Sequence, residues 1–335
     1  MLMREEKHSL GWRRLGLGLS VALLLAAACL LLSGRFHSPD GREEYGQAFA
    51  EQYRLLSPPL PDSLTFAGED VPLDRSDVRE ALDRELLVNV YWQSNLLLLM
   101  KRANRWFPVM EPILKKNGVP DDFKYLAVIE SGLLNVVSPA KAAGFWQFLK
   151  ATGQSYGLEI TDFVDERYDV AKATEAACAY LKASKAKCGS WTAAAAGYNM
   201  GYGGYGKAAA AQHTQVYWDL YLNDETSRYV YRILAIKLLF KRPERYGVCL
   251  RQCDLYQPIA MDTLLADTSI ADLRNYALQR GVSYKLLKQS NPWLRGTSLP
   301  NVSGKQYRIF LPKADAMSYR KQMRETTPEA LFKGR

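Results

Sequence analysis

The stretch over residues 120–147, PDDFKYLAVIESGLLNVVSPAKAAGFWQ, determines how the rest of the chain can be interpreted. A helix that begins with Pro120 at its first position places Glu130 on its apolar face. The other members of that face are Phe123, Leu126 and Ala127. Burying an ionised carboxylate without a partner costs several kcal/mol, so such a group usually keeps its proton and its pKa rises well above about 4.3. The pattern therefore predicts a protonated Glu130 near neutral pH, which can act as a general acid.

The residues after this helix favour a carbohydrate ligand. Taken alone, Glu130 fits better as an exposed residue in the last turn of a short helix that ends at Gly132. The loop that follows, however, offers two aromatic rings and an amide, from Phe145, Trp146 and Gln147. A sugar ring has an apolar face and a rim of hydroxyl groups, so aromatic rings beside an amide suit it. This neighbourhood favours the functional interpretation of Glu130.

Four motifs, in order along the chain, resemble those of the family 1 lytic transglycosylases. They are Glu130-Ser131, Gly144-Phe145-Trp146-Gln147-Phe148, Gly197-Tyr198-Asn199 with Gly201, and Glu225-Thr226 with Tyr229-Val230. Between them, the chain is similar to the membrane-bound transglycosylase D type, which cleaves peptidoglycan, at Tyr156-Gly157-Leu158, Asp165-Glu166-Arg167 and Ala173-Thr174. The resemblance covers roughly residues 105–239 and implies a mainly α, lysozyme-like (goose-type) catalytic domain.

The resemblance also implies a role for each motif residue. Glu130 would be the catalytic residue, and Ser131 would orient it. The other implied substrate-binding residues are Phe145 and Trp146, which would shape the cleft, and Gln147, Tyr198, Asn199 and Tyr229, which would hold the sugar. Without the resemblance, Tyr198 and Asn199 fit the end of a helix equally well, because Asn tolerates the left-handed conformation found there. Tyr229 alone would fit a core position.

The number of acidic residues in the motifs limits the chemistry. Glycosidases ordinarily use two carboxyl groups, but the motifs supply no second acid close to Glu130, and the resemblance places Glu225 outside the catalytic role. Glu130 would first protonate the glycosidic oxygen between N-acetylmuramic acid and N-acetylglucosamine. It would then take the proton of the C6 hydroxyl, which closes a 1,6-anhydro ring without consuming water. The muramic N-acetyl group could steady the developing positive charge, and no cofactor is needed.

Two other functions remain open. A muramidase of the same fold would hydrolyse the same bond with the help of an aspartate, for which Asp162, Asp165 and Asp169 are the candidates. A non-catalytic cell-wall protein would grip glycan strands in the cleft. Product analysis separates the first of these from a transglycosylase, because anhydro products are one water lighter than hydrolysed ones.

Composition agrees with a partner that carries negative charge. The chain has 335 residues, enough for two domains, and a formal net charge of +9. No nucleic-acid fold signature is present and the basic residues are spread along the chain, so nucleic acid is not the expected partner. The carboxylates of peptidoglycan or an anionic membrane surface would attract a chain with this positive charge equally well. Metal binding is not expected, since none of the three histidines lies near a cysteine cluster.

The N-terminal region predicts export to the bacterial cell envelope. Within residues 1–34, an apolar run over residues 15–32 follows four basic residues, Arg4, Lys7, Arg13 and Arg14. Such a segment is a signal peptide or a membrane anchor with the rest of the chain in the periplasm. Cys29 leaves lipidation as a further alternative. Residues 35–74, with Ser57-Pro58-Pro59-Leu60-Pro61 at their centre, predict a linker.

Residues 75–247 predict the helical catalytic domain. Ser76 suits an N-cap, and apolar positions from Val78 to Met100 predict one long helix. A short helix is expected between Pro108 and Gly118. Further helices are expected over residues 170–187, 191–198 and 225–240, and Gly247 marks the end of the domain.

Residues 255–312 resemble a divergent LysM module, a small α+β fold of two strands and two helices. Two β-branched and aromatic segments flank two helical patterns and support that shape independently. The usual Gly-Asp-Thr opening is Met261-Asp262-Thr263 here, so both glycan binding and a purely structural role stay open. Residues 313–335 predict a basic tail with a frayed helix.

The cysteines leave a disulfide open. Four of the five lie beyond the apolar segment, at positions 178, 188, 249 and 253. Cys178 and Cys188 would be roughly 15 Å apart on one helix, too far for a disulfide. Cys249 and Cys253 could pair in a loop of an oxidising compartment.

Overall fold

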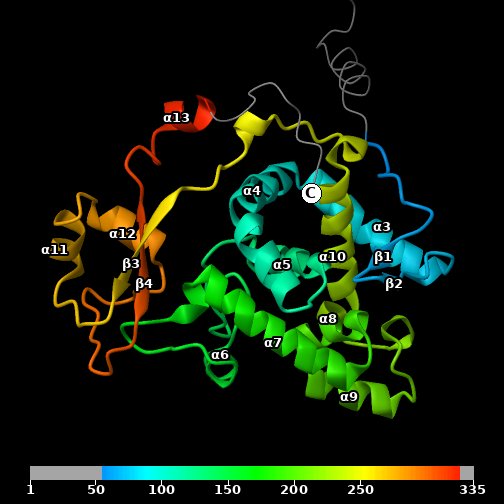
Figure 1. Ribbon diagram of the computed structural model, residues 1–335. Helices are drawn as coiled ribbons and strands as arrows, with labels where there is room; N and C mark the ends of the chain where they lie inside the picture. The colour runs from blue at the N-terminus through cyan, green and yellow to red at the C-terminus, as the bar shows by residue number, and fades with distance from the viewer. Residues whose placement is uncertain (1–54, 325–335) are drawn as a thin grey trace, which may run out of the picture. The chain divides into compact units, whose positions relative to one another are not determined.

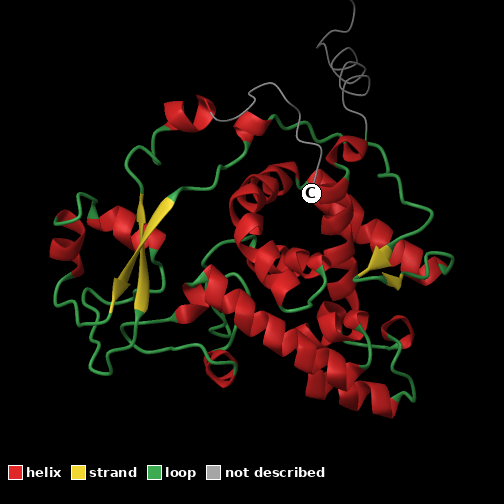
Figure 2. Cartoon of the chain, in the orientation of Figure 1, coloured by secondary structure: helices red, strands yellow, loops and turns green. Residues whose placement is uncertain are grey.

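Helices make up most of the described chain, which confirms the predicted fold class (Figures 1 and 2). The computed structural model describes residues 55–324. Its helices before the C-terminal module are α3 (Ser76–Tyr91), α4 (Gln93–Lys116), α5 (Lys124–Ser131), α6 (Lys150–Ser155), α7 (Val170–Cys188), α8 (Trp191–Met200), α9 (Tyr202–Ala211) and α10 (Asp224–Lys241). Short 3-10 turns are η1 (Asp121–Phe123), η2 (Glu166–Tyr168), η3 (Tyr217–Asp219), η4 (Pro243–Tyr246) and η5 (Gln252–Asp254).

Several expectations fall outside the described range. They are the signal peptide or anchor over residues 1–34, the first part of the linker over residues 35–54, and the end of the tail over residues 325–335. Among residues 55–324, none of the helices has the length and hydropathy that crossing a bilayer requires.

The second half of the expected linker is part of the folded domain. β1 (Thr65–Phe66) and β2 (Glu69–Asp70) form a two-residue hairpin whose turn contains Gly68 with φ 84°. Phe66, Val71 and Leu73 are buried in the same hydrophobic core as the helices. The linker prediction is therefore wrong for residues 65–73, because strands this short leave almost no alternation to detect.

The boundaries of the helices before the site also differ from the prediction. The long helix expected from Val78 is interrupted at Trp92, which has φ −91° and ψ 57° and separates α3 from α4. The short helix expected from Pro108 is the second half of α4, which also contains Pro112. An interior proline removes a helical hydrogen bond and normally bends or ends a helix. The buried face of α4 nevertheless continues as far as Leu114, so tertiary packing outweighs that cost.

The helices pack around the short helix α5. α10 lies against α3, α5 and α8, and α7 lies against α4 and α8. The side chains of residues 193–196 in α8 are all fully buried alanines. Small side chains let neighbouring helices approach closely, so this run places α8 directly between α7 and α10. Burial of this kind supplies the main stabilising term of the fold.

The C-terminal module has the predicted two strands and two helices. β3 (Met261–Ala266) pairs antiparallel with β4 (Tyr307–Pro312), in the register Met261 to Pro312 and Ala266 to Tyr307. α11 (Leu273–Leu278) and α12 (Tyr284–Ser290) lie between the strands in the chain, and α13 (Tyr319–Arg324) follows them. The described residues from Pro58 onward belong to one compact unit.

The described cysteines form no disulfide. Cys178 and Cys188 are buried thiols, and burial raises the pKa of each. Cys249 and Cys253 are not joined within residues 55–324, although their spacing would have allowed it. The same residues contain no group of three or more His, Cys, Asp or Glu side chains that could hold a metal ion.

Candidate active site

Glu130 lies in the last turn of α5, where the backbone is held by side chains from two other helices. α5 starts at Lys124, after the η1 turn, and not at Pro120 as expected. Gly132 ends it in the left-handed conformation with φ 60°. Two arginines donate to carbonyls on either side of Glu130: Arg232 Nη2 to Ile129 O at 3.1 Å and Arg102 Nη1 to Gly132 O at 3.1 Å. The backbone that carries Glu130 is therefore fixed by side chains from α10 and α4.

The Glu130 carboxyl group is held by α10. The hydroxyl of Tyr229, a buried residue of α10, donates a hydrogen bond to Glu130 Oε1. Although Glu130 as a residue is half-buried, its carboxyl group is closely surrounded by protein atoms, and this loss of hydration raises its pKa. The bond from Tyr229 and the charge of Arg232 oppose the rise, whereas the charge of Glu225 adds to it. The direction agrees with the prediction that Glu130 tends to stay protonated.

The third and fourth motifs are joined by hydrogen bonds at the ends of α8 and α10. Asn199 Nδ2 donates to Glu225 Oε1 at 2.9 Å, and Asn199 Oδ1 accepts from Thr226 Oγ1 at 2.7 Å. Tyr198 lies next to Asn199, and its hydroxyl donates to Trp146 O at 2.7 Å. Burial raises the pKa of Tyr198, and the Glu130 carboxylate adds to that rise. Tyr198 and Tyr229 therefore both lie in the electrostatic reach of Glu130.

The second motif forms a loop, residues 144–148, that is tied to α5 through Ser131. Ser131 Oγ donates to Phe145 O at 2.9 Å and to Ala127 O at 3.2 Å. Gln147, which has φ 51°, donates through Nε2 to Gly144 O at 2.8 Å and to Val136 O at 3.1 Å. The Ser131 side chain therefore links the end of α5 to the motif loop, and its role in orienting Glu130 stays a prediction.

Phe145 and Trp146 are core residues. Their exposed fractions are 2% and 0%. The Trp146 indole Nε1 donates to Thr174 Oγ1 at 2.9 Å, and the Phe145 ring meets the edge of Trp106 with centroids 5.2 Å apart. Neither ring offers a face to a ligand, so the expectation of stacking surfaces there is wrong. Their contacts with Thr174 and Trp106 fix the loop that carries them.

The sequence analysis named Glu225 in the fourth motif but did not place it near Glu130, and it did not name Arg232. Glu225 and Arg232, whose charges act on Glu130, lie four residues before and three residues after Tyr229 in α10. That spacing puts all three on one helix face, so it could have revealed them. The loop after Gly132 also exposes three apolar side chains, Leu134, Val136 and Val137.

Two of the three aspartates considered for a muramidase are engaged in other contacts. Asp165 pairs with Arg167 at 2.7 Å, and Asp169 caps α7 by accepting from the Lys172 amide at 3.0 Å. Asp162 is exposed in the turn before them. Within residues 55–324, the acidic group whose charge acts on Glu130 is Glu225, and none of the three aspartates does so.

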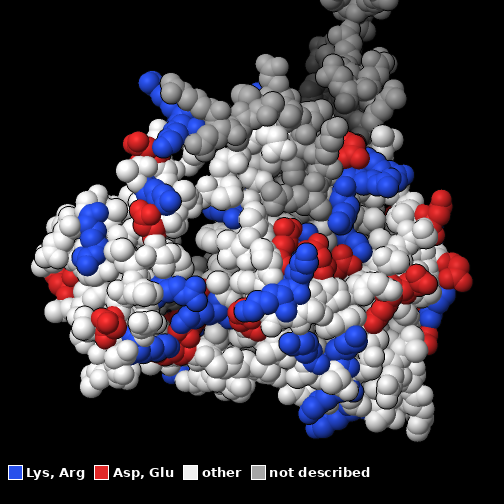
Figure 3. Space-filling view, viewed as in Figure 1, with Lys and Arg blue, Asp and Glu red and all other residues white. Residues whose placement is uncertain are grey.

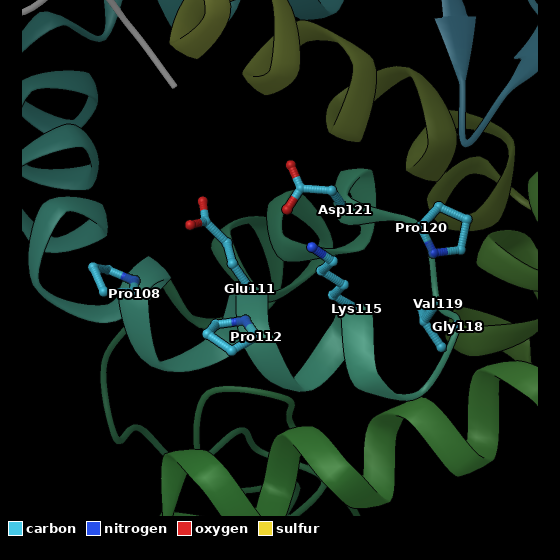
Figure 4. A pocket seen from close by; sticks show the side chains of 8 residues that line it. All are labelled: Pro108, Glu111, Pro112, Lys115, Gly118, Val119, Pro120 and Asp121. Atoms are coloured by element: carbon cyan, nitrogen blue, oxygen red, sulfur yellow. The ribbon is translucent and has the colours of Figure 1, made fainter.

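Two cavities lie in other parts of the described chain. One of about 850 Å³, shown in Figure 4, is lined by the second half of α4 and the turn that follows, including Glu111 and Asp121. Lys124, which is only 3% exposed, binds both carboxylates, at 2.8 Å and 2.6 Å. This cluster stands at the opposite end of α5 from Glu130. The other cavity, of about 360 Å³, lies between residues 60–64 and the end of α10.

The charged surface does not single out a nucleic-acid site. On the face shown in Figure 3, acidic and basic side chains are intermingled and do not form one continuous basic patch. The electrostatic footprint typical of nucleic-acid binding is therefore not visible on that face.

Comparison with known proteins gives the domain families. Residues 108–220 match the transglycosylase SLT domain, and residues 263–315 match the soluble lytic transglycosylase C-terminal LysM-like domain. The chain is similar to the membrane-bound lytic murein transglycosylase D of Escherichia coli K12, with 30% identity over 274 residues. The same values hold for the protein of that name from Escherichia coli O6:H1. These matches cover 79% of this chain and 59% of each relative, so the chain spans about three-fifths of their length.

Proposed function

We propose, from the transglycosylase SLT domain and the LysM-like domain that this chain contains, that it is a peptidoglycan lytic transglycosylase. It would cleave the β-1,4 bond between N-acetylmuramic acid and N-acetylglucosamine and leave a 1,6-anhydro ring on the muramic acid. The observation that carries the proposal is the carboxyl group of Glu130, whose pKa is raised by burial and which accepts a hydrogen bond from Tyr229.

The hydrogen bond from Tyr229 supports the acid step. Because the Tyr229 hydroxyl donates to Oε1 of Glu130, the proton of the neutral acid belongs on Oε2. That oxygen would donate to the glycosidic oxygen as the bond breaks. The carboxylate left behind would be stabilised by the Tyr229 hydroxyl and by the charge of Arg232, both of which favour its ionised form.

The same carboxylate would then act as the base. It would accept the proton of the muramic C6 hydroxyl, whose oxygen attacks C1 and closes the anhydro ring. The muramic N-acetyl group would stabilise positive charge on C1 between the two steps. Glu225 is exposed and its Oε1 accepts from Asn199, so it supports the positioning of the fourth motif better than a second catalytic role.

The sugar would be held by Gln147, Tyr198, Asn199 and Tyr229. Each of these side chains already makes a hydrogen bond that fixes its direction, which lowers the entropy cost of binding. The exposed Leu134, Val136 and Val137 would supply the apolar contact that the buried Phe145 and Trp146 do not. Substrate contact therefore extends to the loop that follows Glu130.

The protein would work in the periplasm of the bacterial cell envelope. A membrane anchor or signal peptide over residues 1–34 remains part of the proposal. The catalytic domain would comprise residues 75–247, extended by the hairpin over residues 65–73, and the LysM-like module residues 255–312.

Mass spectrometry of fragments released from purified sacculi tests the function. We expect soluble muropeptides that end in anhydromuramic acid, and we expect Glu130→Gln to release none while it still binds sacculi. Fragments heavier by one water would identify a muramidase. Binding without release by the unaltered protein would identify a non-catalytic wall protein.

A further inference from the structure

We propose that the LysM-like module, residues 255–312, positions the motif loop, residues 144–148, through a bridging segment, Glu159 to Tyr168. The module would then act as a structural support, or brace, for the catalytic site, in addition to any role in binding glycan. This inference rests on the proposed function, because its effect is measured as catalysis. It follows from contacts that run without a break from the module to Glu130.

The first contact joins the module to the bridging segment through the backbone. The Asp165 amide donates to Trp293 O at 2.9 Å, and the Arg295 amide donates to Phe163 O at 2.8 Å. Between these bonds, Val164 forms a β-bridge with Leu294. The bridging segment is therefore paired with the module as a short additional strand would be.

Charged side chains reinforce this pairing. Lys305 of the module forms an ion pair with Glu159 and a second one with the buried Glu166 at 3.2 Å. The Tyr307 hydroxyl donates to Glu159 Oε1 at 2.9 Å. Glu159 and Glu166 lie on the two arms of the turn in the bridging segment. By pairing with both carboxylates, Lys305 holds the two arms together.

The module and the site also share a hydrophobic core. The buried cluster of the module contains Leu273, Leu287, Leu294 and Ile309, and it includes Ala143, Val164 and Tyr168 from the other domain. Ala143 immediately precedes the motif loop. A freely tethered binding module would have a core of its own, whereas this one is incomplete without residues from the catalytic domain.

Arg167 carries the connection from the bridging segment to the motif loop. Its guanidinium is held by Asp165 and donates through Nη1 to Lys141 O and Phe148 O, each at 3.0 Å. Lys141 precedes the motif loop and Phe148 is its last residue. The Arg167 backbone also approaches Gly144 so closely that a Cβ on Gly144 would stand 1.9 Å from Arg167 O.

The last contacts reach the catalytic residue. Phe145 O accepts the hydrogen bond of Ser131, the neighbour of Glu130, and Trp146 O accepts that of Tyr198. Displacing the motif loop would therefore shift both the end of α5 and the tyrosine beside the carboxyl group. Displacements of this kind lower catalysis even where no substrate contact is lost.

A double-mutant cycle on the full-length protein tests the brace. The two changes are Lys305→Met in the module and Arg167→Lys in the bridging segment. Each should lower kcat about tenfold, with KM changed less than about twofold. Independent changes would multiply to a loss of about a hundredfold in kcat. If both act through one connection, the double variant should lose much less kcat than that. Kinetics should be measured on sacculi and on a short soluble glycan, with thermal melting to verify folding.

The control is Lys313→Met, because Lys313, which directly follows β4, pairs at 3.9 Å with Asp262 in β3, away from the bridging segment. It should leave kcat unchanged. Additive losses, or a Lys305→Met effect confined to KM on sacculi, would overturn the brace and favour a glycan-binding module. If the unaltered protein releases no anhydro product, the proposed function fails independently of this test.

Discussion

Tyr229 and Glu130 are 99 residues apart in the chain, yet the hydroxyl of the first donates directly to the carboxyl group of the second. Tyr229 projects from α10 and Glu130 from the end of α5, two helices that pack against each other. The bond lowers the pKa of Glu130 while burial raises it. The pKa of the proposed catalytic group is thus a balance between burial and a hydrogen bond from a distant part of the chain.

Replacing that tyrosine should change the pH dependence of catalysis. In Tyr229→Phe the bond that favours the carboxylate is lost, so the pKa of Glu130 should rise further. The acid step needs protonated Glu130, so the alkaline limb of kcat/KM should move to higher pH, while kcat falls about tenfold because the carboxylate is less stabilised. A pH–rate profile measures both effects. Tyr221→Phe, at a highly exposed position, is the matched control and should leave the profile in place.

Removing the acid should stabilise the fold at alkaline pH. A carboxyl group whose pKa is higher in the folded than in the unfolded state binds more protons when folded, so its contribution to stability falls as pH rises through that interval. Glu130→Gln should therefore gain melting temperature relative to the unaltered protein at pH 8, with a smaller gain, or none, at pH 4. Calorimetry at the two pH values measures the difference. A gain that does not depend on pH would contradict a raised pKa.

Replacing Trp146 should lower the free energy of unfolding without changing substrate binding. Thr174→Val removes the acceptor of the buried indole N–H and leaves it unpaired, which should cost about 1–3 kcal/mol of unfolding free energy. Trp146→Phe should cost a similar amount through lost packing and the lost bond. Urea unfolding measures both. A direct stacking role predicts the opposite pattern, with KM raised by Trp146→Phe and unaffected by Thr174→Val.

Gly144 should tolerate no side chain. It has φ 82°, and a Cβ would stand 1.9 Å from Arg167 O, so Gly144→Ala forces the motif loop away from the bridging segment. We expect a loss of about 1–3 kcal/mol or more in stability and a fall in kcat. Gly203→Ala is the matched control, because Gly203 lies inside α9 with open space around it. There the substitution should be neutral or stabilising by about 0.5–1 kcal/mol.

Local pattern was enough to predict the environment of Glu130. The spacing that puts it on an apolar face, and the glycine that ends the helix two residues later, both act within a few residues. The same reasoning failed for Phe145 and Trp146, since an aromatic side chain in a loop has the same local signature whether it faces solvent or the core. The buried position of these rings depends on Thr174 and Trp106, which are distant from them in the chain and which local pattern therefore does not reveal.

Long-range packing also explains the other differences. Trp92 separates two helices that the apolar pattern predicts as one, and Pro108 lies inside a helix that it was expected to begin. The hairpin around Phe66 is buried only because helices from later in the chain cover it. The shared core of Ala143 and Val164 with the C-terminal module has no sequence signal at all, because it joins segments more than a hundred residues apart.

That shared core has a consequence for the order of events in the life of the chain. Its members extend from Ala143 to Leu311, so the cluster cannot close until residues up to Leu311 have been synthesised. The core that contains Tyr229 and Phe145 has no such requirement, because its last member is Leu255. If the module holds the motif loop as proposed, that loop would be the last part of the candidate site to reach its final position during folding.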